Sequence, residues 1–421
     1  MDRVKRLKED LVQTGRLGRR PERKVETYEE LDPQHGVTRP TGSEENRKLR
    51  DYAVDRMHEI GLEVSVDRIG NIFGRKEGFK SNSTVMFGSH LDSVVNGGMF
   101  DGALGVFGAI EAIRRIREDG FVNHRALEVV IFTGEEGSAF KQTLLGSSVL
   151  TGKTKLEQAL EMKNDEGQTL EEVLQDIGYK GHYQRNLDDV EYMLELHIEQ
   201  GPVLYEERIP VGVIENITGI EWMLVTILGQ ENHAGTTPMK MRKDALVAAA
   251  EIISFVHNQA NTMMEELGSS TVGTVGKVKV FPNGINAVPG KVELGIDIRD
   301  VRLDLMEEFR NEILKVIDIV RNRYRVRAEV DMPPIHRPAP LSTELISIIE
   351  KSANQLGIRS KRMNSGAGHD SQNMAEKVKT GMIFIPSVNG ISHSPLEWSD
   401  WEDIEKGVKV LTQTVKNVSS I

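Results

Sequence analysis

Histidine and acidic side chains follow short apolar runs of this chain at spacings that suit metal binding. The run Thr84–Phe87 predicts a strand, and His90 and Asp92 come just after it, two residues apart and so on the same side. A glycine-rich loop then leads to Asp101 at the start of a predicted helix. Open α/β sheets keep their sites at the carboxyl ends of strands. We therefore expect a metal site here, with Asp92 accepting the second ring N–H of His90.

A pair of glutamates, Glu135 and Glu136, follows the apolar run Ala126–Thr133, which is typical of a strand buried on both faces. Adjacent side chains that leave a strand diverge, so one can bind a metal while the other takes a proton from water. Two neighbouring glutamates are by themselves more often a solvent-exposed helix start. Their place between two glycines after a buried strand favours the catalytic interpretation.

Two further histidines, His197 and His393, also come after apolar runs that predict strands. With His90, Asp101 and one member of the glutamate pair they offer five potential ligands, more than one tetrahedral zinc ion needs. Two metals that share the Asp101 carboxylate would use all five. A lone histidine at a strand end is more often structural, and that interpretation is kept for the histidines outside the set: His35, His58, His124, His182, His257 and His336.

The composition narrows the classes of function. The chain has 421 residues, enough for two domains, and its net charge of −11 argues against a nucleic-acid partner. It has no cysteine, so a metal must be held by His, Asp and Glu, which suits zinc, manganese, cobalt or nickel. No apolar run is long enough for a membrane span or a secretory signal, and a cytoplasmic enzyme is expected.

The order of apolar patterns predicts an α/β chain with a second domain inserted into the first. Strands and helices alternate up to about residue 212, and the pattern resumes after a proline-rich exit at Pro333, Pro334 and Pro338. Between them, residues 213–331 predict a compact two-layer α+β unit. We thus expect a metal-binding domain of residues 1–212 and 332–421, and an inserted domain of residues 213–331.

Seven segments resemble, in this order along the chain, the dinuclear metal amidases of the peptidase M20 superfamily. The branch they resemble is that of the N-carbamoyl-L-amino acid hydrolases, β-ureidopropionases and allantoate amidohydrolases. The segments are GSHLDSVVNGGMFDGALG, FTGEEGSAF, ELHIEQGPVL, NHAGTTPM, NAVPGKVELGIDIRD, SGAGHDSQNM and SVNGISHSP. The resemblance implies a mixed-sheet, zinc-peptidase-like catalytic domain with helices on both faces, and an inserted lid and dimerisation domain.

The resemblance also implies roles for the candidate residues. Those matching His90 and His197 hold one metal, those matching Glu136 and His393 hold the other, and the one matching Asp101 bridges them. The residue matching Glu135 is the general base, and Asp92 matches a supporting carboxylate. Aminopeptidase-like relatives carry Asn or Asp after the bridging carboxylate, where this chain has Gly102. That difference favours the carbamoylase branch.

Outside the metal ligands, the resemblance implies substrate contacts. His233 matches a histidine that stabilises the oxyanion, usually from the partner subunit, although a turn histidine bonded to its own backbone is the simpler interpretation. Arg299 matches an arginine that binds the substrate carboxylate, helped by the residues matching Gln200, Asn286 and His369. From the strand pattern alone, Arg299 could equally form a surface ion pair with Asp297 or Asp300.

The sequence thus predicts a hydrolase that cleaves the carbamoyl C–N bond of N-carbamoyl-L-amino acids, giving the amino acid, carbon dioxide and ammonia. Allantoate amidohydrolase is the first alternative, and an M20 aminopeptidase or deacylase a more distant one. A silent, metal-stabilised binding protein is disfavoured because Glu135 and all five ligands are present. We expect two divalent ions per subunit, zinc first and Mn²⁺, Co²⁺ or Ni²⁺ as alternatives, a small carboxylate-bearing substrate, and a homodimer through residues 213–331.

Overall fold

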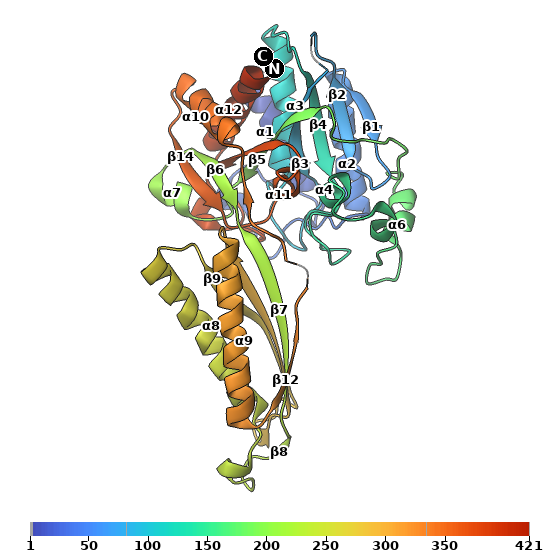
Figure 1. Ribbon diagram of the computed structural model, residues 1–421. Coiled ribbons are helices and arrows are strands. Elements are labelled where there is room, and N and C mark those ends of the chain that lie inside the picture. The colour runs from blue at the N-terminus through green and yellow to red at the C-terminus, as the bar shows by residue number, and fades with distance from the viewer. Residues whose placement is uncertain (1–2, 81, 334, 421) are drawn as a thin grey trace. The chain divides into compact units, whose positions relative to one another are not determined.

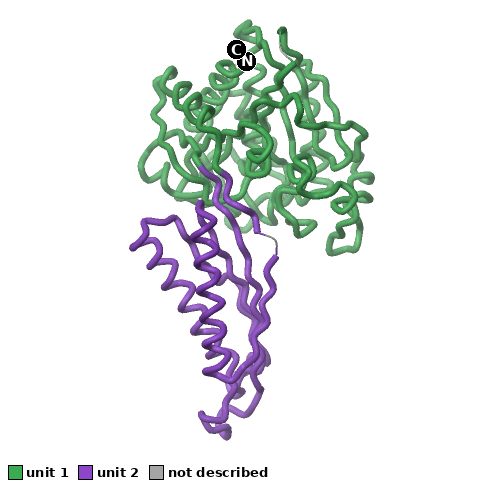
Figure 2. The backbone as a smooth tube through the Cα atoms, viewed as in Figure 1, with its two compact units in different colours: residues 1–215, 340–421 green, residues 216–339 purple. Residues whose placement is uncertain are grey.

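A computed structural model describes residues 3–80, 82–333 and 335–420 and divides the chain into two compact units. Unit 1 comprises residues 1–215 and 340–421, and unit 2 comprises residues 216–339 (Figure 2). The second unit is inserted into the first. The sequence-based boundaries after residues 212 and 331 lie a few residues earlier at both crossings.

Unit 1 is built, in the described part of the chain, on a nine-stranded mixed sheet in the order β1-β2-β4-β3-β5-β15-β6-β13, with β14 paired to β6. The central strands β4, β3, β5 and β15 are parallel, and the flanking β1, β2 and β6 pair antiparallel. The mixed sheet predicted from the sequence is confirmed. The strands are β1 Glu63–Val66, β2 Ile72–Lys76, β3 Thr84–His90, β4 Ala126–Phe132, β5 Val190–Ile198, β6 Val211–Ile217, β13 Ala339–Pro340, β14 Ser360–Ser365 and β15 Lys379–Ile385.

Helices cover both faces of this sheet (Figure 1). Helix α3 packs against one face, because a Cβ on its Gly105 would contact Ser89 of β3. Helix α11 packs against the opposite face, where its Met374 packs with Met86 of the same strand. The core is therefore apolar on both sides of the central strands. The helices of unit 1 are α1 Arg3–Arg16, α2 Glu44–Glu59, α3 Ala103–Glu118, α4 Leu145–Leu150, α5 Leu156–Leu160, α6 Leu170–Asp176, α7 Val203–Glu207, α10 Thr343–Gln355, α11 Asp370–Met374 and α12 Trp401–Ser419.

Unit 2 pairs a four-stranded antiparallel sheet, in the order β12-β7-β11-β9 among its described residues, with two long helices. Alternation along β7 explains the two layers, because Met223 and Val225 are buried against the helices while Trp222 and Leu224 are exposed. Its elements are β7 Gly219–Leu228, β8 Asn232–His233, α8 Ala245–Leu267, β9 Val272–Phe281, β10 Ala287–Val288, β11 Lys291–Asp300, α9 Leu303–Tyr324 and β12 Arg327–Asp331. No described helix is long and apolar enough to cross a membrane.

Two strands of unit 1 depart from the sequence-based reading. The expected boundary after residue 212 falls inside β6, because Val211–Ile217 contains no proline or loop-forming cluster that would mark a domain border. The strand β14, Ser360–Ser365, was not predicted, since its sequence SKRMNS lacks the apolar alternation of a half-buried strand. Both strands lie on the β15 side of the sheet, away from the first motifs.

Candidate metal centre

The candidate ligands come from the carboxyl ends of neighbouring strands. His90 is the last residue of β3, His197 lies one residue before the end of β5, and Glu136 follows β4 by four residues. His393 stands in the loop after β15. Since β4, β3, β5 and β15 are adjacent and parallel, their carboxyl ends meet at one edge of the sheet.

Asp101 lies at the centre of this cluster. Its Oδ1 is 3.1 Å from His197 Nε2 and 3.6 Å from His90 Nε2, while its Oδ2 is 3.2 Å from His393 Nε2. Glu136 Oε2 lies 3.4 Å from the same His393 nitrogen. Two ligand groups result, His90–Asp101–His197 and Asp101–Glu136–His393, each with potential ligand atoms within 4.8 Å of one another. The structure thus brings all five predicted ligands together, and Asp101 belongs to both groups.

Local backbone geometry explains how these side chains approach so closely. A Cβ at Gly102, which has φ +63°, would come within 2.5 Å of the His90 ring. The glycine after Asp101 is therefore required by the packing of His90 against the helix start. His393 and Gln200 have φ values of 52° and 59°, in the left-handed region that non-glycine residues rarely occupy. Such conformations cluster at functional sites.

Asp92 supports the cluster through different atoms from those expected. His90 Nδ1–H donates to the Asp92 carbonyl oxygen at 3.0 Å, whereas the Asp92 carboxylate is 3.8 Å from that nitrogen. The carboxylate instead accepts the backbone N–H groups of Glu135 and Glu136, at 3.3 and 3.2 Å. The prediction that the Asp92 carboxylate accepts the His90 ring N–H is therefore wrong, because the backbone carbonyl oxygen of Asp92 accepts it. Asp92 fixes both the ring of His90 and the start of the glutamate pair.

The cluster is largely buried except for the half-exposed His393, and its charged groups lie close together, which shifts their protonation. Burial and the neighbouring Asp101 raise the pKa of Glu136 to about 8, and burial raises the pKa of Glu135 well above its usual value. The hydrogen bond to Asp101 raises the pKa of His393 to about 9. Burial opposes the charged form of His90, but Glu135, Asp101 and Asp92 outweigh it and raise the pKa of that imidazole.

The donor set fits divalent metal ions. Glu136 Oε1 is buried and has no hydrogen-bond partner among the described residues, which is costly unless a cation or proton neutralises it. His90 and His197 both turn Nε2 toward Asp101, because their Nδ1 atoms donate to backbone carbonyls, that of Asp92 and that of Ile198. Imidazole and carboxylate donors suit zinc, manganese, cobalt or nickel.

A further group that could hold a metal, Glu195–His197–His369, has another explanation. Glu195 Oε1 accepts the Ser89 hydroxyl at 2.6 Å, and Oε2 accepts the hydroxyl and backbone N–H of Ser371 at 2.6 and 3.2 Å. Its carboxylate is thus engaged in cross-linking β3, β5 and α11. This leaves the Asp101-centred cluster as the candidate metal centre.

Two of the predicted substrate residues lie beside this cluster in unit 1. Gln200 Nε2 donates to Asp101 Oδ2 at 3.0 Å and lies 3.3 Å from the Ser392 hydroxyl. His369 is buried, with its ring centroid 4.5 Å from that of His197, and its Nε2 is 3.0 Å from the Ser365 hydroxyl. Burial and the nearby His197 lower the pKa of His369 well below its usual value. A neutral imidazole is therefore expected there.

The other predicted substrate residues belong to unit 2 and lie at its two ends. Arg299 of β11 is the register partner of Ile220 of β7, a few residues from the point where the chain enters unit 2. Its guanidinium forms a bidentate ion pair with Asp297 at 2.8 and 3.1 Å. His233 of β8 pairs with Ala287 of β10, the residue after Asn286, and β10 ends three residues before Lys291 at the start of β11. Eight residues of β11 separate Lys291 from Arg299, about 27 Å along an antiparallel strand.

His233 is held in a defined tautomer by its own turn. Its Nδ1 accepts the backbone N–H groups of Gly235 and Thr236, at 3.0 and 3.2 Å, so the ring proton resides on Nε2. The side chain is exposed. The turn-histidine interpretation therefore describes the bonding of His233, and an Nε2–H donor remains directed away from that turn.

Sequence reasoning did not single out two buried charged residues behind the cluster. Glu397 accepts hydrogen bonds from the backbone N–H of Asp101 and from Ser392. The Arg39 guanidinium donates to the carbonyl oxygens of Thr14 and Leu17, and burial lowers its pKa to about 10. The position of Glu397 four residues after His393 was the available signal, but an acidic residue near a helix start is common on protein surfaces.

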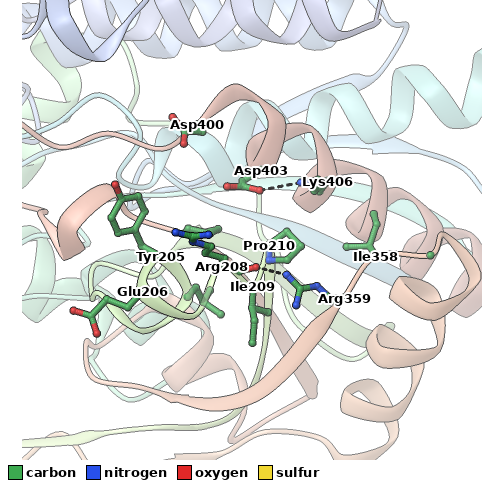
Figure 3. A pocket seen from close by; sticks show the side chains of 13 residues that line it. Tyr205, Glu206, Arg208, Ile209, Pro210, Ile358, Arg359, Asp400, Asp403 and Lys406 are labelled. Atoms are coloured by element: carbon green, nitrogen blue, oxygen red, sulfur yellow. Dashed lines mark hydrogen bonds and ion pairs between the residues drawn. The ribbon is translucent and has the colours of Figure 1, made fainter.

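A cavity of about 620 Å³ lies elsewhere on unit 1, between α7, the start of α12 and residues 357–359 (Figure 3). Three of its charged residues are engaged, since Lys406 is 3.3 Å from Asp403 and Arg359 donates to the Arg208 carbonyl oxygen. The five candidate ligands are not among the described residues that line it. The site is thus assigned from ligand geometry and not from cavity size.

Comparisons with known proteins show which family the chain matches. The family model "Peptidase family M20/M25/M40" matches residues 86–417. The chain is 40% identical to an N-carbamoyl-L-amino-acid amidohydrolase of Pseudomonas sp. (strain NS671), covering 90% of this chain and 92% of that one. It is 35% identical to the allantoate amidohydrolase of Bacillus subtilis, covering 90% and 91%. An amidase of the hydantoinase/carbamoylase family from Burkholderia multivorans superposes with a TM-score of 0.89 at 32% identity, covering 99% and 98%.

Proposed function

Because the chain belongs to peptidase family M20, in its hydantoinase/carbamoylase branch, we propose that it hydrolyses N-carbamoyl-L-amino acids. The coarser statement, an amidohydrolase that acts on C–N bonds, follows from the family itself. The observation that supports the finer proposal is the convergence of three histidines and Glu136 around the Asp101 carboxylate, at the carboxyl ends of neighbouring strands.

Two divalent ions would be held by His90, Asp101 and His197 on one side and by Asp101, Glu136 and His393 on the other. When bound, they would polarise the carbamoyl carbonyl group and lower the pKa of a water molecule. Zinc is the first choice for these nitrogen and oxygen donors, with Mn²⁺, Co²⁺ and Ni²⁺ as alternatives.

Glu135 is proposed as the general base. Its carboxylate is buried, lies 3.8 Å from His90 Nε2, and has a raised pKa because of that burial. A base with a raised pKa takes a proton from water and passes it on readily near neutral pH. The water oxygen bonds to the carbamoyl carbon, the bond to the amino-acid nitrogen breaks, and Glu135 delivers the proton to that nitrogen. The carbamate so released decomposes to carbon dioxide and ammonia.

The remaining residues are proposed to bind and orient the substrate. Arg299 would hold the carboxylate of the amino acid through its planar guanidinium, which Asp297 already orients. Gln200, Asn286 and His369 would contact the rest of the ligand. The His233 Nε2–H would donate to the oxygen on which charge develops, an interaction worth on the order of 10²–10³ in rate.

The separation of His233 from Arg299 supports a homodimer. Arg299 lies about 27 Å along β11 from Lys291, and His233 belongs to the β8–β10 pair on the Lys291 side, so the two side chains do not contact the same small substrate. If both residues serve one site, His233 comes from a second copy of the chain, and the exposed strands and helices of residues 213–331 are the proposed dimer interface.

Allantoate is the alternative substrate, because it also carries a carboxylate and ureido groups and a 35% identical relative is named for it. A side-by-side assay of N-carbamoyl-L-amino acids, allantoate and dipeptides on zinc- and manganese-loaded enzyme separates the candidates. We expect kcat/KM to be highest for an N-carbamoyl-L-amino acid. A higher value for allantoate or for a dipeptide would replace the proposed substrate with that compound.

A further inference from the structure

Glu397 connects two loops that carry candidate metal ligands. It is fully buried, and its Oε1 accepts the backbone N–H groups of Phe100 and Asp101 at 3.0 and 3.1 Å. Its Oε2 accepts the hydroxyl of Ser392, the residue before His393, at 2.7 Å. One carboxylate thus spans the loop of the bridging ligand and the loop of the last ligand.

The loop of His393 needs such support more than the strands do. His393 adopts a left-handed backbone conformation with φ 52°, which is unfavourable for a non-glycine residue unless its surroundings hold it. His90 and His197 stand on central strands of the sheet, whose ladders fix their backbones. Of the two ligand groups, the one with His393 therefore depends on loop contacts.

The contacts of Glu397 form a closed circuit around Asp101. The Ser392 hydroxyl, which donates to Glu397, lies 3.3 Å from Gln200 Nε2, and that amide donates to Asp101 Oδ2 at 3.0 Å. The Asp101 backbone returns the connection to Glu397. The main chain and the carboxylate of Asp101 are thus both tied to the His393 loop.

Packing leaves Glu397 no alternative position. A Cβ at Gly98 would overlap the Glu397 carboxyl group, so the glycine-rich loop closes directly over it. The next residue, Trp398, packs edge-to-face on Phe100 with ring centroids 5.3 Å apart. The carboxylate is held from both sides, as a rigid support requires.

We propose that Glu397 is a positioning residue that holds His393 and Asp101 at ligand distance from each other. The inference rests on the proposed two-metal function of the cluster. Loss of Glu397 then weakens the metal of Asp101, Glu136 and His393 while the metal of His90, Asp101 and His197 is largely retained.

Titration of metal-free protein with Co²⁺, followed by visible absorption, tests this. Wild-type protein is expected to bind two equivalents. In Glu397→Ala the second equivalent should bind 10- to 100-fold more weakly, the usual cost of losing a residue that orients a ligand, and the first within about threefold of wild type. Glu397→Gln should stay within about threefold for both, because its Oε1 still accepts two N–H groups and its amide can donate to Ser392.

Asp300→Ala is the matched control. Asp300 is a fully buried carboxylate of unit 2 that, like Glu397, accepts a backbone N–H, from Arg302 at 2.7 Å, and a hydroxyl, from Thr271 at 2.5 Å. Its loss should lower the melting temperature and leave both Co²⁺ affinities unchanged. An equal weakening of the second metal in this control would attribute the effect to general destabilisation and overturn the inference.

Ser392→Ala covers the case in which Glu397→Ala fails to fold, since it removes only the bond to Glu397 Oε2 and the contact with Gln200. It should also weaken the second equivalent, and unchanged Co²⁺ binding in this variant would overturn the inference. The inference would also be overturned if Glu397→Ala bound both equivalents of Co²⁺ as tightly as wild type, or if Glu397→Gln bound the second equivalent as weakly as Glu397→Ala. No substrate enters these titrations, so a failure of the proposed carbamoylase activity would be seen separately.

Discussion

Arg299 stands near the end of β11, whereas His233 belongs to a separate two-stranded sheet of β8 and β10, and β10 precedes the start of β11 in the chain. Mixing the variants Arg299→Ala and His233→Ala tests whether two chains build one site. In a hybrid dimer, one site then combines an intact Arg299 with an intact His233 of the other copy. Random pairing makes half of the dimers hybrid with one intact site each, so the mixture should regain about a quarter of wild-type activity.

The two inactive variants are mixed, their dimers are dissociated in a low concentration of denaturant, and the subunits are allowed to reassociate. The quantity measured is kcat of the reassociated mixture. Each variant alone supplies the baseline. Activity that stays at that baseline while hybrids are detected by mass would place His233 in its own chain's site.

Glu135→Gln is expected to lower kcat by about 10²–10⁴, the range of a positioned general base, without changing metal content. The amide keeps the size of the side chain but cannot take a proton from water. Metal analysis should still find two ions per chain, because the proposed ligands are untouched. Wild-type turnover in this variant, with two ions bound, would refute the role of Glu135.

Arg299→Lys should raise KM for an N-carbamoyl amino acid by about 10- to 100-fold, the equivalent of roughly 1.5–3 kcal/mol for a lost charged hydrogen bond. Lysine keeps the charge but loses the planar fork that pairs with Asp297 and with a carboxylate. The carboxamide analogue of the substrate is the control, and its KM should differ little between the two proteins. A matching rise with the carboxamide would indicate a general disturbance of unit 2.

The metal-free protein should become less stable as the pH rises from about 7 to 9. His393 and Glu136 have pKa values raised to about 9 and about 8, so each binds its proton more tightly in the folded than in the unfolded chain. Stability from such groups is complete at low pH and is lost as the pH passes through the folded-state pKa. Melting curves of metal-free protein at pH 7, 8 and 9 measure this.

Metal binding should release protons over the same pH range, because the ligands must lose them first. Calorimetry of Zn²⁺ binding at pH 7 in two buffers of different ionisation enthalpy counts the protons. The loaded protein should melt at a higher temperature than the metal-free protein, because bound metal adds about 2.7 kcal/mol of stability per site at a hundredfold excess over Kd.

For the pH prediction, a melting temperature of the metal-free protein that rises from pH 7 to 9 would contradict the raised pKa values of His393 and Glu136.

The ligand-bearing strands could be predicted because strands buried on both faces contain continuous apolar segments. The strands that end at His90, Phe132 and Ile385 each contain a continuous apolar segment and are buried along almost their whole length, as strands covered on both faces are. Parallel neighbours then bring their carboxyl ends together. The α/β class, and the meeting of distant histidines and carboxylates at one edge, follow from that pattern, whereas the mixed sheet was implied by the family resemblance.

The remaining features depend on contacts between segments that a linear pattern does not contain. The Asp92 carboxylate binds backbone N–H groups 43 and 44 residues further on, and Glu397 binds those of a loop almost 300 residues earlier. Backbone groups have no sequence signature, so neither partner could be identified. The polar strand β14 pairs with β6, and it was missed because its sequence lacks the apolar alternation of a half-buried strand.

The two points at which the chain leaves and re-enters unit 1 are neighbours, since the Leu341 N–H donates to the Glu215 carbonyl oxygen at 2.8 Å. To the larger sheet, the whole of unit 2 is therefore equivalent to an oversized hairpin loop between β6 and β13. Closing even a very long loop adds little entropy cost, because that cost grows only with the logarithm of its length. A chain in which a short turn joins Glu215 to Pro340 should still fold around its metal ligands, as a minimal scaffold stripped of Arg299 and His233.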